Sequence, residues 1–208
     1  STELIHLYLA TDLVESRLEP RRLIEQVVEV IRPLAEEAGL GVEVRAAPGL
    51  PEALTGDEGR LRQILLNLLG NAVKFTERGS VTLRVTMPSS APLDEGMACL
   101  RFEVEDTGVG IAPEHLAAIF EPFKQVGDDR YKAQGTGLGL AISRNLIRMM
   151  GGELRVVSKP GQGAIFSFEL NAPVVMADLG RSRSETRRVI GVDGAAPNIL
   201  VVDDDAVN

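Results

Sequence analysis

The spacing of apolar residues changes from helical to strand-like within the first half of the chain. Over residues 57–75 the apolar side chains recur every three or four positions, which predicts a helix with one buried face. Residues 81–87 and 100–104 instead alternate apolar and polar side chains, which predicts two half-buried strands. A second one-sided pattern over residues 20–38 predicts another helix, in which Pro33 should cause a kink or a broken turn.

The rest of the chain continues this mixture of helices and strands. Residues 112–134 have no clean period, so they predict a short helix beginning at Pro113 followed by a long loop. A loop of that length inside a domain is usually functional. Roughly helical spacing also predicts a helix within residues 1–18. The remaining predicted elements are strands at 42–45, 154–156 and 165–168 and a helix over 138–150.

Composition narrows the class of protein. The 22 basic and 30 acidic residues give a net charge of −8, whereas a nucleic-acid-binding protein is expected to be basic. Aromatic residues make up only 4% of the chain, which also disfavours base stacking. No apolar run approaches the roughly 20 residues of a membrane span. The single cysteine, Cys99, is expected to be a buried, reduced thiol.

A polar stripe lies opposite the apolar face of the predicted helix 57–75. At about 100° per residue, Asn67, Asn71 and Lys74 share this stripe with Arg60 and Gln63. Such a stripe is usually solvated surface, but Asn is unfavourable inside a helix because its side chain competes for backbone hydrogen bonds. An amide oxygen suits Mg²⁺, which usually keeps waters and substrate phosphates as further ligands. The stripe therefore indicates a magnesium and phosphate site.

Two glycine-rich segments follow the stripe. Residues 106–110 (Asp-Thr-Gly-Val-Gly) come after a strand, where the carboxylate of Asp106 could accept a hydrogen bond from the amine of adenine or could merely order a β-turn. Residues 135–139 (Gly-Thr-Gly-Leu-Gly) open a helix, whose free N–H groups and dipole attract anions. A flexible hinge is the alternative there, because this segment lacks both the dinucleotide fingerprint and a Walker lysine.

Four motifs thus follow one another in a fixed order. They are Asn67-x-x-x-Asn71-x-x-Lys74-Phe75, Asp106-x-Gly108-x-Gly110-Ile111, Phe120-Glu121-Pro122-Phe123 and Gly135-x-Gly137-x-Gly139-Leu140. This order resembles the four boxes of the sensor histidine kinase catalytic and ATP-binding domain, a member of the GHKL superfamily with the Bergerat fold. The resemblance implies a two-layer α/β sandwich, in which a mixed β-sheet is covered by helices on one face and a mobile ATP lid spans residues 112–134.

The resemblance also implies ATP and Mg²⁺ as cofactors and a role for each motif. Asn71 should be the Mg²⁺ ligand, with Asn67 and Lys74 beside the phosphates, and Asp106 should read the adenine amine. The other implied nucleotide contacts are Phe75, Gly108, Gly110, Ile111, Gly135, Thr136, Gly137, Leu138, Gly139 and Leu140.

Catalysis is expected to depend on cations near the γ-phosphate. Lys74 and, in the lid, Arg130 are the candidates for this role, with Lys132 as a weaker one. One residue departs from the family pattern: Ala164 stands where the family often has a hydroxyl residue, which affects the expected nucleotide affinity rather than the fold.

The resemblance divides the chain into four parts. Residues 1–18 resemble the end of the dimerisation and phosphoacceptor hairpin, and residues 20–173 are the catalytic and ATP-binding domain. Residues 174–197 are a linker, and residues 198–208 resemble the first strand of a truncated receiver domain, as in a hybrid kinase. Neither histidine, His6 nor His115, lies in the family's phosphoacceptor motif, so the acceptor histidine is expected outside this chain.

The implied function is that of a protein-histidine kinase catalytic domain in two-component signal transduction. It would supply ATP·Mg²⁺ for phosphoryl transfer to a histidine on its own phosphoacceptor domain. The implied partners are that domain and the receiver domain within a homodimeric parent, together with a downstream phosphotransfer or response-regulator protein. The domain is expected to be cytoplasmic, whether the parent is soluble or anchored to a membrane.

Two other hypotheses remain open. A hydrolytic ATPase of the gyrase, Hsp90 and MutL type would use a Glu at the position of Asn67 as general base, and Asn cannot take up a proton at neutral pH. A nucleotide-binding regulatory module, comparable to a pseudokinase, is suggested only by Ala164.

Overall fold

Five strands form one mixed sheet in the computed structural model, which describes residues 14–88, 95–125 and 136–175. The strand order is β2-β4-β5-β7-β6; β2 and β4 run parallel, and the other neighbours are antiparallel. The bounds are β2 Gly41–Ala46, β4 Ser80–Thr86, β5 Met97–Asp106, β6 Arg155–Ser158 and β7 Ala164–Pro173. Cys99 is buried within β5, as expected, and burial raises the pKa of its thiol.

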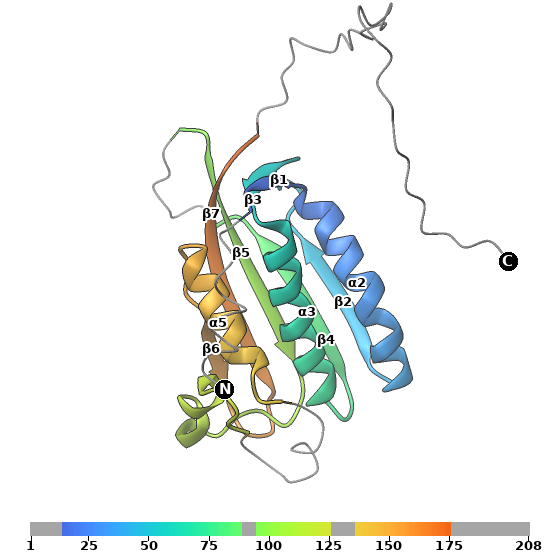
Figure 1. Cartoon of the computed structure of the whole chain (residues 1–208). Helices are drawn as coiled ribbons and strands as arrows, with labels where there is room; N and C mark the ends of the chain where they lie inside the picture. The colour runs from blue at the N-terminus through green and yellow to red at the C-terminus, as the bar shows by residue number, and fades with distance from the viewer. Residues whose placement is uncertain (1–13, 89–94, 126–135, 176–208) are drawn as a thin grey trace, which may run out of the picture. The chain divides into compact units, whose positions relative to one another are not determined.

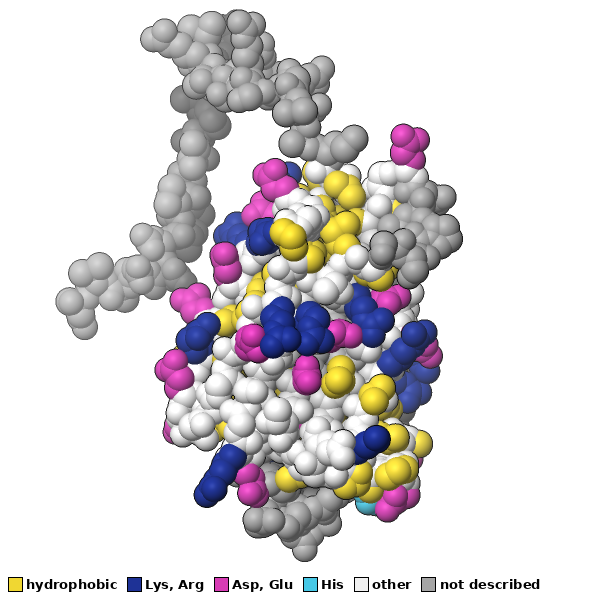
Figure 2. Space-filling view, turned by 180° about the vertical axis from the view of Figure 1, so that it is seen from behind, with side chains coloured by type: hydrophobic (Ala, Val, Ile, Leu, Met, Phe, Trp, Pro, Cys, Tyr) yellow, Lys and Arg dark blue, Asp and Glu magenta, His cyan; other side chains and the backbone are white. Residues whose placement is uncertain are grey.

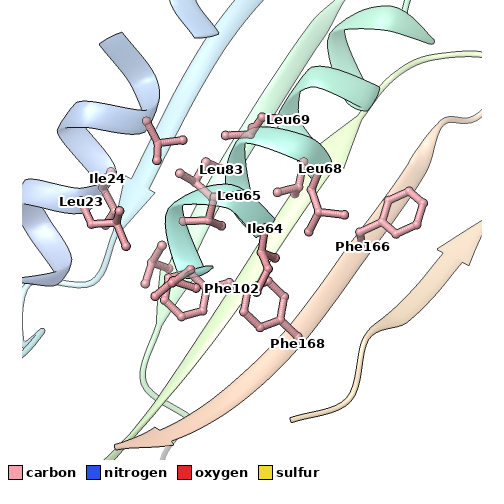
Figure 3. Close-up of a cluster of buried hydrophobic side chains, with 14 of the residues drawn as sticks. Leu23, Ile24, Ile64, Leu65, Leu68, Leu69, Leu83, Phe102, Phe166 and Phe168 are labelled. Atoms are coloured by element: carbon pink, nitrogen blue, oxygen red, sulfur yellow. The ribbon is translucent and has the colours of Figure 1, made fainter. Parts of the chain in front are cut away.

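The helices of the described residues cover one face of this sheet, as Figure 1 shows. They are α2 (Pro20–Glu37), α3 (Glu58–Lys74) and α5 (Gly139–Met149). Their apolar faces pack onto Phe102 of β5 and Phe168 of β7, whose stacked rings lie 5.0 Å apart between centroids (Figure 3). The two-layer α/β sandwich predicted from the sequence is therefore confirmed. No helix within the described ranges is long and apolar enough to cross a membrane.

Helix α3 is held by both its cap and its buried face. Asp57 is the N-cap, because its carboxylate accepts the backbone N–H of Arg60 at 3.0 Å. A fully buried aliphatic side chain stabilises a fold by about 1.5–3 kcal/mol relative to an exposed one. The buried side chains that hold α3 on the sheet are Leu61, Ile64, Leu65, Leu68, Leu69 and Ala72. The polar stripe of the same helix is thus presented on a fixed support.

Helix α2 continues through Pro33 to Glu37, so of the two predicted outcomes, a kink or a broken turn, the broken turn does not occur. Proline removes one backbone hydrogen bond, to the carbonyl four residues earlier, which here belongs to Glu29. Both residues lie on the exposed side of the helix, where water can satisfy that carbonyl. The side chains that hold the other side of α2 in the core are Leu23, Ile24, Val27, Val28, Ile31 and Ala35.

The predicted helix of residues 1–18 is wrong at its end. Ser16–Leu18 form a strand, β1, that pairs antiparallel with β3 (Leu54–Gly56). The residue before a proline is restricted to extended conformations, so Pro20 prevents a helix from running into α2. Glu19 accordingly has φ −106° and ψ 100°. The earlier part of the prediction, residues 1–13, lies outside the described residues.

The predicted linker also begins later than position 174. Val174 donates its N–H to the carbonyl of Gly96 at 2.7 Å, and Val175 donates to the carbonyl of Ala53 at 2.9 Å. Val174 also forms an antiparallel bridge with Leu54 of β3. These two residues therefore still belong to the domain. The remaining predicted linker and receiver strand lie outside the described residues.

The face of the sheet that the helices leave open carries charged side chains of both signs (Figure 2). Arg84 of β4 pairs with Glu103 at 2.8 Å and with Glu105 at 3.3 Å. Arg101 pairs with Glu103 at 2.9 Å and with Glu169 at 3.2 Å. Burial alone would raise the pKa of Glu103, but the hydrogen bonds and charges of the two arginines outweigh it and lower that pKa.

We expect Glu103 to make the stability depend on pH. Because its folded pKa lies below its ordinary value of 4.5, its contribution is present above that value and is lost as the pH falls through the folded pKa. Glu103→Gln should lower the free energy of unfolding by about 1 kcal/mol at pH 7, and the deficit should shrink in acid. Urea denaturation between pH 7 and pH 3 checks this. A deficit independent of pH would contradict it.

Candidate functional site

A cavity of about 580 Å³ lies between α3 and the beginning of α5. Its size is typical of sites for small molecules. The residues that line it are Gly59, Arg62, Gln63, Leu66 and Asn67 from α3, together with Thr136, Leu138, Gly139, Ile142 and Ser143. The structure thus brings four of the predicted nucleotide contacts together here: Asn67, Thr136, Leu138 and Gly139.

Asn67 is fixed by the first turns of α5. Its amide nitrogen donates to the hydroxyl of Ser143 at 2.7 Å, and Ser143 is only 1% exposed. A Cβ atom added to Gly139 would lie 2.2 Å from the amide oxygen of Asn67. Glycine at position 139 therefore lets the Asn67 side chain lie against the start of α5, and any larger residue there would have to displace that side chain.

Gly139→Ala should weaken this contact. Its methyl group must displace the Asn67 side chain and break the bond to Ser143, which should destabilise the fold by about 1–3 kcal/mol. Gly70→Ala is the matched control, because a Cβ at Gly70 of α3 meets no atom within 4 Å. That control should stabilise the fold by up to about 1 kcal/mol. Chemical denaturation measures both variants, and equal stabilities for them would contradict the expected contact.

Helix α5 begins without a side-chain cap. Leu138 is the N-cap residue and makes no capping hydrogen bond; its own N–H donates to the hydroxyl of Thr136 at 3.4 Å. The N–H groups and the dipole at such a helix start favour an anion. This end of α5 opens on the cavity that Asn67 lines. The cavity end of the site is therefore suited to phosphate.

Asp106 lies buried at the end of β5 with one carboxylate oxygen engaged. Its Oδ1 accepts the N–H of Gly108 at 2.9 Å and the N–H of Ala164 at 3.3 Å. Burial raises the pKa of Asp106, and these two hydrogen bonds partly oppose the increase. Within the described residues no hydrogen bond reaches Oδ2. Since no fully buried side-chain oxygen among these residues lacks a partner, Oδ2 is not fully buried. Oδ2 is thus open to a donor, while Oδ1 orders the turn.

The glycines after Asp106 pack against protein backbone. A Cβ on Gly108 would lie 2.2 Å from the carbonyl oxygen of Phe75, at the end of α3. Gly110 has φ 68°, and a Cβ there would lie 2.0 Å from the carbonyl oxygen of Lys159. Sequence reasoning assigned these glycines to the approach of a ligand. Their observed neighbours show that they first allow the turn to lie against α3 and the segment after β6.

Two further contacts hold the neighbourhood of Asp106. The N–H of Ile111 donates to the hydroxyl of Ser158 at 2.8 Å, and that hydroxyl donates to the carbonyl of Gly163 at 2.6 Å. Ile111 and Leu140 are half-buried against the core cluster. Ala164, the residue without the family's hydroxyl, contacts Asp106 through its backbone N–H. That contact does not depend on its side chain.

The end of α3 lies between the cavity beside Asn67 and the turn that contains Asp106. Its predicted site residues are Asn71, Lys74 and Phe75. Eight residues separate Asn67 from Phe75, which corresponds to about 12 Å of helix. Asn71 is half-buried between them, and within the described residues no hydrogen bond engages its amide group. Burial lowers the pKa of Lys74, whose Nζ lies 5.0 Å from the centroid of the Phe75 ring.

The described parts of the predicted lid meet at its base. The N–H of Phe123 donates to the carbonyl of Gly137 at 3.0 Å. Phe123 has φ 63°, a value that bulky residues rarely adopt, and it is 54% exposed. Arg144 of α5 lies 5.4 Å from the centroid of the Phe120 ring. The segments before and after residues 126–135 are therefore tied together.

Two parts of the lid prediction have different outcomes. The short helix predicted at Pro113 is a 3₁₀ turn, Pro113–His115, and a second one follows at Ala118–Phe120. The candidates Arg130, Lys132 and Gly135 lie outside the described residues.

Sequence reasoning missed three polar residues of the site. Ser143 lies four residues after Gly139, on the same face of α5, and this spacing could have found it. Arg62 lines the cavity and pairs with Gln26 at 2.6 Å and with Glu58, a combination that requires α2 to lie beside α3. Ser158 acts only through the turn that it holds, so no local pattern indicates it.

Comparison with known proteins identifies relatives of this domain. Hybrid signal transduction histidine kinase B of Dictyostelium discoideum is 40% identical over 151 residues, which are 72% of this chain and 8% of that protein. Aerobic respiration control sensor protein ArcB of Escherichia coli K12 is 40% identical over 176 residues, or 84% of this chain and 21% of that protein. The chain thus spans about a fifth or less of the length of these relatives.

A solved structure and a family model agree with these relatives. The crystal structure of full-length ShkA in complex with AMPPNP has a TM-score of 0.67 and 42% sequence identity, covering 81% of this chain and 33% of ShkA. The family model described as histidine kinase-, DNA gyrase B-, and HSP90-like ATPase matches residues 56–174, more than half of the chain. The chain belongs to this ATPase family.

Proposed function

We propose that this chain is the ATP-binding catalytic domain of a hybrid sensor histidine kinase. It would supply ATP·Mg²⁺ for phosphoryl transfer to a histidine outside residues 1–208. The observation that carries the proposal is the arrangement along α3. An open carboxylate oxygen of Asp106 lies beyond one end of the Asn67–Phe75 stretch, and a cavity with an uncapped helix start lies at the other.

The adenine is proposed to bind at the Asp106 end. Oδ1 is committed to the N–H groups of Gly108 and Ala164, so Oδ2 can accept the exocyclic amine. A hydrogen bond to a charged group contributes about 1.5–3 kcal/mol, enough to select a base. Phe75, Gly108, Gly110 and Ile111 would complete this end of the site.

The phosphates are proposed to bind at the cavity end, beside Asn67 and the start of α5. Among the described residues, no three His, Cys, Asp or Glu side chains gather as a metal site. Mg²⁺ often binds through few protein ligands together with substrate phosphates, which fits the half-buried amide of Asn71. When bound, Mg²⁺ would neutralise charge on the phosphates. Gly135, Thr136, Gly137, Leu138, Gly139 and Leu140 would supply the surrounding backbone.

Positioning and charge neutralisation account for most of the catalysis in phosphoryl transfer. We assign this work to Lys74, whose ammonium group lies at the end of α3, and to Arg130. Asn67 argues against a hydrolytic ATPase, because an amide cannot act as a general base for water. The amide nitrogen of Asn67 is moreover engaged by Ser143.

The partners follow from this role. We propose that the domain acts on its own dimerisation and phosphoacceptor segment, in a homodimeric parent with a receiver domain. The phosphoryl group would then pass to a downstream phosphotransfer or response-regulator protein. The reaction would take place in the cytoplasm.

Two measurements on the 208-residue chain test the proposal. Calorimetric titration should show binding of Mg·AMPPNP, with a dissociation constant on the order of 1 μM to 1 mM, the range in which enzymes commonly hold their substrates. Incubation with ATP should release no inorganic phosphate above background. Absence of binding would contradict the proposed site, and sustained hydrolysis would favour the gyrase-type alternative.

A further inference from the structure

A buried ion pair lies at the start of α3, where its arginine, Arg60, stands in the chain between Gly59 and Arg62, which line the cavity. The Arg60 Nε atom lies 3.1 Å from Oδ2 of Asp57, and both side chains are about 10% exposed. Burying two charges costs free energy unless they are well paired and hydrogen-bonded. The arrangement of this pair therefore depends on each hydrogen-bond donor that contacts the Asp57 carboxylate.

One of those donors comes from the segment that enters the domain, residues 14–18. The N–H of Val14 donates to Oδ2 of Asp57 at 3.1 Å. The same entering segment continues into β1, which pairs with β3, and the hydroxyl of Ser16 donates to the carbonyl of Gly56 at 3.2 Å. Asp57 follows directly after β3. The N-cap of α3 thus holds the entering segment by a hydrogen bond to a buried carboxylate.

The other side of the ion pair reaches α5. Arg60 Nη1 lies 3.7 Å from the sulfur of Met149, the last residue of α5. The start of α3 therefore meets the end of α5, and the two helices lie side by side in Figure 1. Further along α3, the Asn67 amide donates to the hydroxyl of Ser143. Seven residues, or about 10 Å of helix, separate these two contacts on α3. Both contacts join the helices that form the walls of the cavity.

We propose that Asp57 and Arg60 are positioning residues that couple the entering segment to the nucleotide cavity. This inference rests on the proposed function. When the entering segment leaves β3, Oδ2 of Asp57 loses the Val14 N–H but keeps Arg60 Nε as a partner. The pair with Arg60 then shifts to compensate for the lost hydrogen bond. The contact of Arg60 with α5, and with it the spacing of the cavity walls, then changes. Nucleotide binding and attachment of the entering segment therefore stabilise each other by the same factor.

Val14→Pro tests this coupling by removing the backbone donor that joins the entering segment to Asp57. Proline lacks the N–H whose hydrogen bond Asp57 accepts, while Asp57, Arg60 and the residues that line the cavity are not themselves substituted. Val14→Ala is the matched control, since it keeps the N–H, and the Val14 side chain is 68% exposed. In calorimetric titrations, Val14→Pro should raise the dissociation constant of Mg·AMPPNP about 5-fold, the lower end of typical coupling factors. Val14→Ala should bind as the wild type does.

Hydrogen exchange supplies the reciprocal measurement and needs no variant. Saturating Mg·AMPPNP should slow amide exchange in residues 14–18 of the wild-type chain, and this protection should be lost in Asp57→Asn. Asn still caps the helix but has one acceptor oxygen instead of two. A merely structural role for the pair would lower stability without making this exchange respond to nucleotide.

The outcomes separate the two proposals. Wild-type binding of Mg·AMPPNP with unchanged exchange in residues 14–18, together with equal affinities of Val14→Pro and Val14→Ala, would overturn the coupling and leave the proposed function intact. Absence of any binding to the wild-type chain would overturn the proposed function and, with it, this inference.

Discussion

Asp106→Asn should weaken Mg·AMPPNP binding by roughly 10- to 100-fold, which corresponds to about 1.5–3 kcal/mol. The amide oxygen can still accept the N–H groups of Gly108 and Ala164, so the turn is expected to stay intact. The amide nitrogen then takes the place of Oδ2 and presents a donor to the adenine amine, which is itself a donor. Calorimetric titration measures the loss.

The identity of the base makes this test sharper. Hypoxanthine carries a keto oxygen where adenine carries its amine, so Asp106→Asn should narrow or reverse the preference for ATP over ITP. Glu105→Gln is the matched control, because it neutralises the neighbouring carboxylate, whose side chain is 39% exposed and pairs with Arg84 on the open face of the sheet. The control should bind within about 2-fold of the wild type. An unchanged base preference in Asp106→Asn would show that Oδ2 does not read the base.

Mg²⁺ should increase the affinity of the wild-type chain for AMPPNP, and Asn71→Ala should remove most of this increase. The affinity for Mg·AMPPNP should therefore fall by about 10-fold or more. The substitution removes the amide oxygen assigned to the metal and leaves Asp106 untouched, so adenosine should bind as before. Alanine is the better helix former, and the fold should therefore be as stable as the wild type or up to about 0.7 kcal/mol more stable. If Asn71→Ala loses its response to Mg²⁺ but keeps the stability of the fold, then Asn71 is a metal ligand rather than a structural residue.

Titrations of AMPPNP with Mg²⁺ and with a chelator measure this effect. Gly70→Ala, next to Asn71 on α3, is the control, since its added methyl group meets no neighbouring atom. It should keep the full metal response. The assignment of Asn71 would fail if its alanine variant responded to Mg²⁺ as strongly as this control does.

The long elements of the fold could be predicted from the sequence because their patterns are long. Helix α3 and strands β4 and β5 each repeat their apolar spacing several times, and their bounds agree with the prediction within a few residues. Strands β1 and β3 have three residues each, and 35 residues lie between them in the chain, so neither has a pattern of its own. Pro33 was expected to kink α2 or to break one of its turns. The helix is continuous, because its buried face outweighs one lost hydrogen bond at an exposed position.

Some features of the candidate site could likewise be predicted from local sequence, and others could not. The polar stripe of α3 follows from helical geometry except at Arg60, which is buried in its ion pair with Asp57. Asp106 follows from its place at the end of a strand. The contact of Gly139 with Asn67 and the bond to Ser143 depend on how closely α5 packs on α3, which no local spacing encodes. The bond from Val14 to Asp57 joins positions 43 residues apart and likewise needs the folded chain.

Phosphoryl transfer to an external histidine tests the central claim most directly. The native protein, extended upstream to include its phosphoacceptor segment, should be incubated with ATP labelled at the γ-phosphate, and the labelled residue should be identified by mass spectrometry. We predict an acid-labile phosphate on a histidine upstream of residue 1 and none on His6 or His115. Label on either of these two histidines, or release of the label as inorganic phosphate without any phosphorylated histidine, would contradict the account.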